Sequence, residues 1–463
     1  MFFLFFAFFL LLFQPVHDQR FEQVEGDWSG AIQVYEEELK INVLFTYSDG
    51  ELDGTLNIPQ QQAFNLPLIV TRAEGDEVVF EFQTGSGPAI FYGIWDPTAQ
   101  TIEGEFEQVG ERFPFSLMKQ PVLSGTSRNI PEIELMIPTT GGVISGSLVL
   151  TEETAPLMIL LSGSGSQDRD ETVAGFGVFK ELSSQLYDRG ISTFRYDDRG
   201  VGHSQGDPDA TLQELANDLA EIVAYLKNHH REQFSSLIFL GHSQGGLVAT
   251  LASAQTEPDA LIFMGVPFLR GDKIINQQIR MISDFRGVSE QIMNTNLEFQ
   301  EEIYNVVRTG SSWEPIEEDL RRRLEEQINQ LPEPQRNALG EMEAFIQSQI
   351  DRQLSAAKSR WFKSMIEYEP SEHLMGISAS ILAIFGEKDR QVSIDENLTE
   401  AARIQNENDL NMDLIRIPGA NHLFQEADTG MPTEYGMLDR AFADEFIATI
   451  VEWVNGLELK TSP

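Results

Sequence analysis

The pentapeptide Gly-His-Ser-Gln-Gly occurs twice in this 463-residue chain, at Gly202–Gly206 and again at Gly241–Gly245. Both copies satisfy Gly-x-Ser-x-Gly, which forms a strained turn exposing a nucleophilic serine when a strand precedes it and a helix follows. Ser243 meets this condition, because it follows the apolar run Ser235–Leu240 and precedes small residues compatible with a helix. Ser204 lies between polar, glycine-broken segments. We therefore predict Ser243 as the nucleophile and a structural role near the site for Ser204.

A serine hydroxyl needs a neighbouring base, and the base needs a carboxylate that orients it. His422 lies in a loop directly after the last predicted strand, and we predict it as the base. Asp389 also follows an apolar strand, at the strand end where parallel sheets hold their ligands, and it is the favoured acid. The alternatives for the acid are Asp395 and Glu387.

Hydrolysis at a carbonyl carbon also needs two backbone N–H groups that stabilise the oxyanion. The first is predicted at Gln244, directly after the nucleophile. The second is predicted in the glycine-rich loop after the apolar run Leu157–Leu161, from Ser164 or Gly163. Neither of the nucleotide-binding motifs Gly-x-x-x-x-Gly-Lys-Ser/Thr and Gly-x-Gly-x-x-Gly occurs in this loop, which argues against a phosphate cradle. Together these residues predict a hydrolytic site that uses no metal and no organic cofactor.

Beyond Pro131, short apolar segments alternate with helical ones, which is typical of a mainly parallel sheet covered by helices on both faces. The clearest helix, Thr211–His229, opens with a Thr-x-x-Glu capping box and repeats apolar residues at helical spacing. Helices alone then fill about Phe268–Glu372, which we interpret as a cap that covers the site and shapes substrate choice. The predicted strands are Gly146–Leu150, Leu157–Leu161, Ser192–Tyr196, Leu237–Leu240, Leu261–Met264, Ile381–Phe385 and Met412–Ile417.

The region from about Phe21 to Lys119 shows short alternating apolar runs separated by turn residues, which predicts an all-β unit, either a small barrel or a sandwich. Before it, Met1–Phe13 is almost entirely apolar and has the length of a signal-peptide core, although no basic segment and no small-x-small cleavage site accompany it. We expect an exported protein, secreted or periplasmic, without a stable membrane span after processing. The expected divisions are a signal peptide at 1–20, the all-β domain at 21–122, and a catalytic domain at 131–460 with its cap at about 268–372.

The charge balance excludes some partners. The chain has 73 acidic residues against 32 basic ones, a formal net charge of −41. Such a field repels phosphate backbones, so nucleic acid is not an expected partner. The acidity fits adaptation to high salt, and it fits a merely soluble acidic protein equally well. The chain has no cysteine, which excludes disulfides, thiolate catalysis and cysteine-ligated zinc.

With these residues assembled, the chain from about 131 to 457 resembles the α/β-hydrolase superfamily, and more narrowly the bacterial esterases grouped with serine aminopeptidase-like hydrolases. Five motifs carry the resemblance, and they occur in the expected order. They are Ser162–Asp170, Tyr196–Ser204, Gly241–Gly246, Gly386–Val392 and Gly419–Phe424. Ser162 stands where many α/β-hydrolases have histidine. The resemblance implies an α/β-hydrolase fold with a helical cap inserted late in the sheet, preceded by a β-rich domain.

The chain order Ser243, Asp389, His422 is that of the catalytic triad in this superfamily. The resemblance therefore implies hydrolysis of a small-molecule carboxylic ester through an acyl-enzyme intermediate. An amidase or aminopeptidase with the same triad is the nearest alternative, since the choice of leaving group depends on the shape of the pocket and cap. A third alternative is a non-catalytic carbohydrate- or lipid-binding module on a degenerate hydrolase, but the complete set of triad residues argues against it.

Overall fold

The computed structural model describes residues 23–457 except for 36, 49–50, 59–62, 85–86, 109, 120–129, 331–335 and 337–340. The predicted signal peptide at 1–20 therefore lies outside the described residues. The chain divides into two compact units, Met1–Pro121 and Val122–Pro463. Within the described ranges, no helix is both long enough and apolar enough to cross a membrane.

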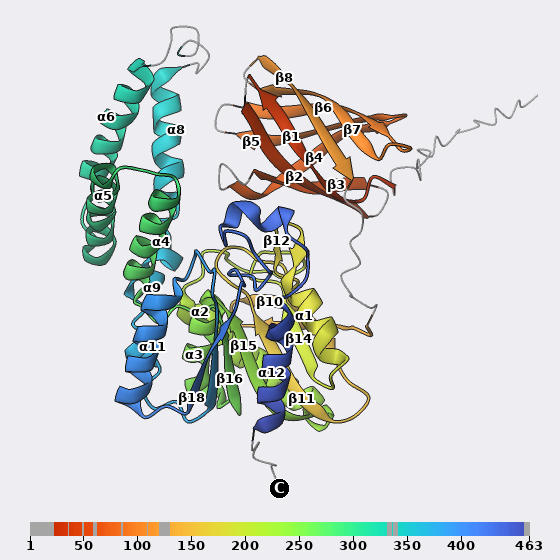
Figure 1. The fold of residues 1–463 in the computed structure, drawn as a ribbon, viewed down its shortest axis with the longest axis vertical. Coiled ribbons are helices and arrows are strands. Elements are labelled where there is room, and N and C mark those ends of the chain that lie inside the picture. Colours follow the sequence, from red (N-terminus) through yellow and green to blue (C-terminus); the bar gives the residue numbers. More distant parts are fainter. Residues whose placement is uncertain are drawn as a thin grey trace, which may run out of the picture. The chain divides into compact units, whose positions relative to one another are not determined.

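The first unit is a closed antiparallel barrel, in which each strand pairs with the next along the chain and β8 pairs back with β1 (Figure 1). Side chains along a strand alternate between interior and surface, and the burial of β6 follows this period of two. Aromatic rings fill the interior, where Phe80 stacks on Phe91 and Phe115 meets both rings edge-on. The prediction of an all-β unit is confirmed, in its barrel form. The strands are β1 (Gly26–Val34), β2 (Glu37–Ser48), β3 (Glu51–Ile58), β4 (Ala63–Glu74), β5 (Glu77–Thr84), β6 (Gly87–Asp96), β7 (Thr101–Gln108) and β8 (Glu111–Lys119).

The second unit is built on an eight-stranded sheet in the order β18-β17-β16-β15-β11-β14-β10-β9. Strand β10 pairs antiparallel with β9 and β14, and the other pairs are parallel. The mainly parallel sheet of the predicted α/β-hydrolase fold is confirmed, with β9 as an edge strand that the sequence pattern did not predict. The strands are β9 (Ile133–Thr139), β10 (Gly142–Val149), β11 (Ala155–Leu161), β14 (Ser192–Tyr196), β15 (Phe234–His242), β16 (Ala260–Met264), β17 (Ser380–Gly386) and β18 (Met412–Ile417), beside a small hairpin of β12 (Thr172–Val173) and β13 (Phe176–Gly177).

Helices cover both faces of this sheet (Figure 1). On the central strand β15, Leu237 and Phe239 belong to one hydrophobic core, whereas Ile238 and Leu240 belong to the core of the opposite face. Successive side chains of a strand point to opposite faces, so a strand buried on both faces reads as an unbroken apolar run. The first core lies under α2 (Leu212–His230), α3 (Gln244–Thr256) and α11 (Ile394–Asn408), and the second under α1 (Val178–Tyr187) and α12 (Asp444–Gly456).

The predicted capping box sets the start of α2. The hydroxyl of Thr211 accepts the backbone N–H of Glu214, and the Glu214 carboxylate accepts the N–H of Thr211. This reciprocal pair satisfies two N–H groups that the first turn of a helix leaves without partners. The helix therefore begins one residue after the threonine, as the sequence indicated.

The interval between β16 and β17 contains helices that share a hydrophobic core of their own, with Tyr304 and Ile350 fully buried in it. Helices α6 and α8 lie side by side within this insertion (Figure 1). The helical insertion of the predicted fold is therefore confirmed. Its described helices are α4 (Gly271–Phe285), α5 (Glu290–Thr309), α6 (Glu314–Gln330), α8 (Met342–Ser355) and α9 (Arg360–Glu367), followed by the short α10 (Pro370–His373).

Candidate active site

Ser243 occupies the sharp turn between β15 and α3, with a backbone φ of +50° and ψ of −118°. A non-glycine residue rarely adopts a positive φ, so this backbone is strained. The glycines around it allow the turn: a β-carbon at Gly241 would overlap the backbone of Gly246, and one at Gly245 would overlap the carbonyl oxygen of Leu161. The second pentapeptide therefore has the strand-turn-helix geometry that presents a serine side chain at the end of the sheet.

His422 lies buried in the loop after β18, and its Nδ1 is 2.6 Å from Oδ2 of Asp389. The other carboxylate oxygen, Oδ1, accepts the N–H groups of Gln391 and Val392 at 2.7 and 2.8 Å. Because an ionised carboxylate can only accept hydrogen bonds, it holds the proton of the ring on Nδ1 of His422, and in the neutral imidazole Nε2 is then the acceptor. This is the orientation that a general base for a serine hydroxyl requires.

The turn at Ser243 and the loop of His422 meet at the end of β16. The N–H of Ser243 donates to the carbonyl oxygen of Met264 at 2.9 Å. The next residue, Gly265, is so close to the base that a β-carbon on it would lie 3.1 Å from Nδ1 of His422. Among the described residues, no hydrogen bond joins the Ser243 hydroxyl to His422, a bond that is often long before substrate binds. The structure thus gathers Ser243, His422 and Asp389 at one edge of the sheet, and their catalytic roles stay a prediction.

The two alternative acids lie in different surroundings. Glu387 is exposed, and its carboxylate accepts the N–H of Gly419 at 3.0 Å. Asp395 is exposed in the first turn of α11, where a carboxylate interacts favourably with the helix N-terminus. Only Asp389, of the three candidates, forms a hydrogen bond with His422. The geometry therefore favours Asp389 for the acid.

The predicted oxyanion donors lie on either side of Ser243. Gln244 is the first residue of α3, so its N–H has no acceptor within the helix. The N–H of Gly163 donates to Oε1 of Glu171 at 2.6 Å. The N–H of Ser164 has no acceptor among the described residues. Of the two alternatives for the second donor, Ser164 is therefore the one whose N–H is free to bind a substrate oxygen.

Ser204 has the position of a structural residue. Its hydroxyl is buried, donates to the carbonyl oxygen of Asp197 and accepts the N–H of Ser145, both at 2.8 Å. These bonds tie the loop after β14 to strand β10. In this described part of the chain, no strand ends directly before Ser204 and no helix begins directly after it. The first pentapeptide thus lacks the geometry of the second.

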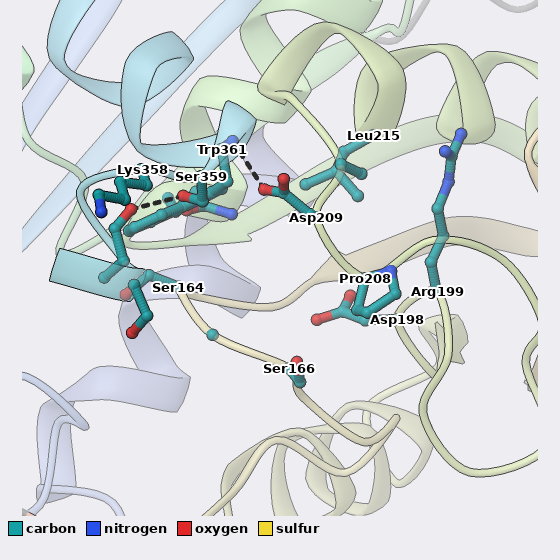
Figure 2. A pocket seen from close by; sticks show the side chains of 15 residues that line it. Ser164, Ser166, Asp198, Arg199, Pro208, Asp209, Leu215, Lys358, Ser359 and Trp361 are labelled. Carbon is teal, nitrogen blue, oxygen red and sulfur yellow. Dashed lines mark hydrogen bonds between the residues drawn. The ribbon is translucent and has the colours of Figure 1, made fainter. Parts of the chain in front are cut away.

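A cavity of about 780 Å³ opens beside the predicted oxyanion donors (Figure 2). Trp361 of α9 forms part of its wall, and the indole N–H donates to the side-chain oxygen of Gln244 at 2.6 Å. The carboxylate of Asp209 accepts the backbone N–H groups of Arg360 and Trp361, each at 3.1 Å. The helical insertion is therefore bound to the rest of the unit at the cavity itself. Its lining includes Ser164, Ser166, Asp198, Leu215, Gln244 and Trp361.

Asp198 is an acidic group on the wall of this cavity. Its carboxylate accepts the hydroxyl of Ser162 at 3.1 Å and the N–H of Gln167 at 2.9 Å. The neighbouring Arg199 points away from it (Figure 2) and pairs with Asp218. Burial raises the pKa of Asp198 to about 7, against the opposing effect of its two hydrogen bonds. Within the described ranges no lysine, arginine or histidine pairs with this carboxylate, so it has no counter-ion.

The sequence did not identify Glu171 or Trp361 as parts of this site. Glu171 directly follows the motif Ser162–Asp170, and a carboxylate beside a glycine-rich loop was its only signal. Trp361 lies 117 residues from Gln244 along the chain, and no local pattern indicates that they meet. Among the described residues, no group of three or more His, Asp or Glu side chains is placed to hold a metal ion.

In comparison with known proteins, this chain is similar to a serine aminopeptidase family and to esterases. Residues 174–299 match the family model described as Serine aminopeptidase, S33. The curated relative "Esterase EstD" of Thermotoga maritima is 22% identical over 302 residues, which cover 64% of this chain and 62% of that protein. The chain thus spans less than two thirds of that relative's length.

Solved esterase structures are similar at lower identity. The esterase Pf2001 of Pyrococcus furiosus is 15% identical, with a TM-score of 0.42, covering 70% of this chain and 92% of that chain. Est1E of Butyrivibrio proteoclasticus, with ferulic acid bound, is 16% identical, with a TM-score of 0.38, covering 69% and 96%.

Proposed function

We propose that this chain, an α/β-hydrolase with a segment that matches serine aminopeptidases, cleaves carboxylic esters with Ser243 as its nucleophile. The observation that carries the proposal is the strained turn at Ser243, placed beside the buried pair of His422 and Asp389. The similarity to an esterase of Thermotoga maritima supports ester hydrolysis as the class of reaction.

In this mechanism, Nε2 of His422 removes the hydroxyl proton as Oγ of Ser243 attacks the carbonyl carbon of the ester. Asp389 holds the imidazole in place and stabilises the imidazolium that forms. The N–H groups of Gln244 and Ser164 stabilise the negative oxygen of the tetrahedral intermediate. His422 then returns the proton to the departing alcohol, and water releases the acid from the acyl-enzyme by the same steps.

A fluorophosphonate probe tests this proposal directly. The probe reacts with activated serines, so we expect one covalent label per chain, on the peptide that contains Ser243. Hydrolysis of p-nitrophenyl acetate should fall in parallel with labelling. A label on Ser204, or hydrolysis that survives complete labelling, would contradict the proposal. A non-catalytic binding module would take up no label at all.

An aminopeptidase is the second candidate, and Asp198 is the observation that favours it. A cavity wall that holds a carboxylate without a counter-ion can attract a cation, such as the free amino group of an aminoacyl substrate. The same triad would then cleave an amide or ester bond next to that amino group. The matched segment of a serine aminopeptidase family agrees with this reading.

Asp198→Asn separates the two candidates when a cationic ester is compared with its neutral isostere. One p-nitrophenyl ester would carry a trimethylammonium group on its acyl chain, and the other a tert-butyl group. Since the pKa of Asp198 is raised to about 7, its carboxylate is charged at pH 8.5 and mostly neutral at pH 5.5. For an aminopeptidase-like pocket, the ratio of the two kcat/KM values should rise about tenfold between these pH values in the native protein, and stay flat in the variant.

The ratio cancels the titration of the triad, because both substrates depend on it equally. A ratio that is independent of pH in the native protein would reject Asp198 as a cation site. Ester hydrolysis without preference for the cation would then remain as the function.

A further inference from the structure

Glu171 and His242 form a buried pair directly beneath the predicted site. Oε1 of Glu171 accepts the N–H of Gly163 at 2.6 Å and lies 2.7 Å from Nδ1 of His242. On the other side of the ring, Nε2 of His242 lies 3.1 Å from the backbone carbonyl oxygen of His422. We call the loop after β11 that carries Gly163 and Ser164 the oxyanion loop. The pair therefore connects this loop to His242, the residue before Ser243, and to the loop of His422.

The two oxygens that face the ring of His242 indicate which of its nitrogens carry a proton. A carbonyl oxygen can only accept, so Nε2 must carry a proton to bond with His422. An ionised carboxylate also only accepts, so Nδ1 must carry a second proton to bond with Glu171. Burial alone lowers the pKa of His242, but the Glu171 carboxylate and the two hydrogen bonds outweigh burial and raise it. The arrangement is consistent with an imidazolium at His242 that pairs with the Glu171 carboxylate.

The buried pair of Glu171 and His242 includes features that lower the stability of the fold. Glu171 is 1% exposed, its second oxygen Oε2 is buried without a hydrogen-bond partner among the described residues, and its backbone φ is +47°. Burying a charge that is incompletely hydrogen-bonded costs free energy, and so does a positive φ at a non-glycine residue. Features of this kind concentrate where function requires a fixed geometry.

We propose that Glu171 and His242 are positioning residues, which hold the oxyanion loop and the loop of His422 in fixed positions around Ser243. This inference rests on the proposed ester hydrolysis. Glu171 fixes the N–H of Gly163, which orients the next residue, Ser164, towards the substrate oxygen. His242 fixes the backbone of His422 through its carbonyl oxygen. Neither side chain touches the substrate in this account.

The titratable groups that interact with His242 include Glu171, His422 and Asp389. Glu171 faces it from the loop before β12, and the rings of His242 and His422 lie 4.7 Å apart between centroids. Asp389, which binds the far side of His422, also favours the charged form of His242. An imidazolium at this place is thus balanced by Glu171 and Asp389.

Glu171→Gln tests the proposal, because glutamine keeps the shape of the side chain and removes its charge. Without the carboxylate, His242 loses its second proton, and it can no longer donate to both neighbours. We expect kcat for p-nitrophenyl esters to fall on the order of 10- to 100-fold, with KM unchanged within about twofold, because misplaced catalytic groups slow the reaction more than they weaken binding. Glu181→Gln, which alters a buried carboxylate on α1, is the matched control and should leave kcat unchanged.

A second measurement is independent of activity. The ¹⁵N shifts of the histidine rings, with His242 assigned by its loss in a His242→Asn protein, report how many protons the ring carries. In the native protein, His242 should stay doubly protonated well above its usual pKa of about 6.5, and in Glu171→Gln it should become neutral.

The outcomes are distinguishable. A native His242 that is neutral at pH 8, or a Glu171→Gln protein with native kcat, would overturn the positioning role. A similar loss of kcat in Glu181→Gln would overturn it too, since any buried carboxylate would then serve. If the native protein hydrolyses no ester, the proposed function fails, and the ring titration still decides whether the pair is charged.

Discussion

Replacing Ser243 with alanine is expected to lower kcat/KM for p-nitrophenyl esters by about 10⁴-fold or more, because the acyl-enzyme cannot form without the hydroxyl. The residual rate should be that of bound substrate attacked by water beside the oxyanion donors. The variant should fold normally, since the N–H of Ser243 keeps its bond to Met264 and the glycines of the turn are unchanged. Initial rates and a thermal melt of the same preparation measure both expectations.

Ser204→Ala is the matched control, because it alters the same pentapeptide at its other copy. We expect kcat/KM to stay within about twofold of the native value, because Ser204 takes no part in the proposed acyl transfer. The loss should appear in stability instead: the buried N–H of Ser145 loses its acceptor, which costs about 1–3 kcal/mol. Urea unfolding measures this difference. If the two variants exchanged these phenotypes, the assignment of the nucleophile would be wrong.

The strand, turn and helix around Ser243 were predictable because their signal is local. The apolar run before Ser243 and the small residues after it specify a strand and a helix, and the glycines between them specify how closely the two approach. The loops of Asp389 and His422 were predictable for a related reason, since the carboxyl ends of parallel strands share one edge of the sheet. In each case the sequence pattern predicts the local structure, and the fold class predicts which loops lie close together.

Contacts between segments far apart along the chain could not be predicted from local sequence patterns. That the Gly163 N–H is occupied by Glu171 depends on the path of the loop after β11, which glycine and serine leave open. The bond between Trp361 and Gln244 depends on how the helical insertion docks, and amphipathic spacing alone does not fix a docking partner. The alternation of apolar and polar residues likewise predicted strands in the first unit. It did not predict the pairing of β1 with β8 that closes the barrel.

Asp389→Asn is expected to lower kcat by about 10⁴-fold near neutral pH, while the turn around it persists. The remaining amide oxygen can still accept the N–H groups of Gln391 and Val392, so the local backbone keeps its bonds. The new amide nitrogen would face Nδ1 of His422 in place of Oδ2, and it can only donate. The proton of the imidazole is then forced onto Nε2, the atom that must accept the serine proton.

Asp395→Asn distinguishes this effect from a general loss of negative charge near the site. Asp395 is exposed at the start of α11, so its variant should keep kcat within about twofold and lose about 0.3–1 kcal/mol of stability from the helix N-terminus. Steady-state rates over a range of pH and urea unfolding measure both variants. Of these two carboxylates it is Asp389 that binds the imidazole, so a large loss of kcat in Asp395→Asn together with near-native kcat in Asp389→Asn would transfer the role of the acid to Asp395.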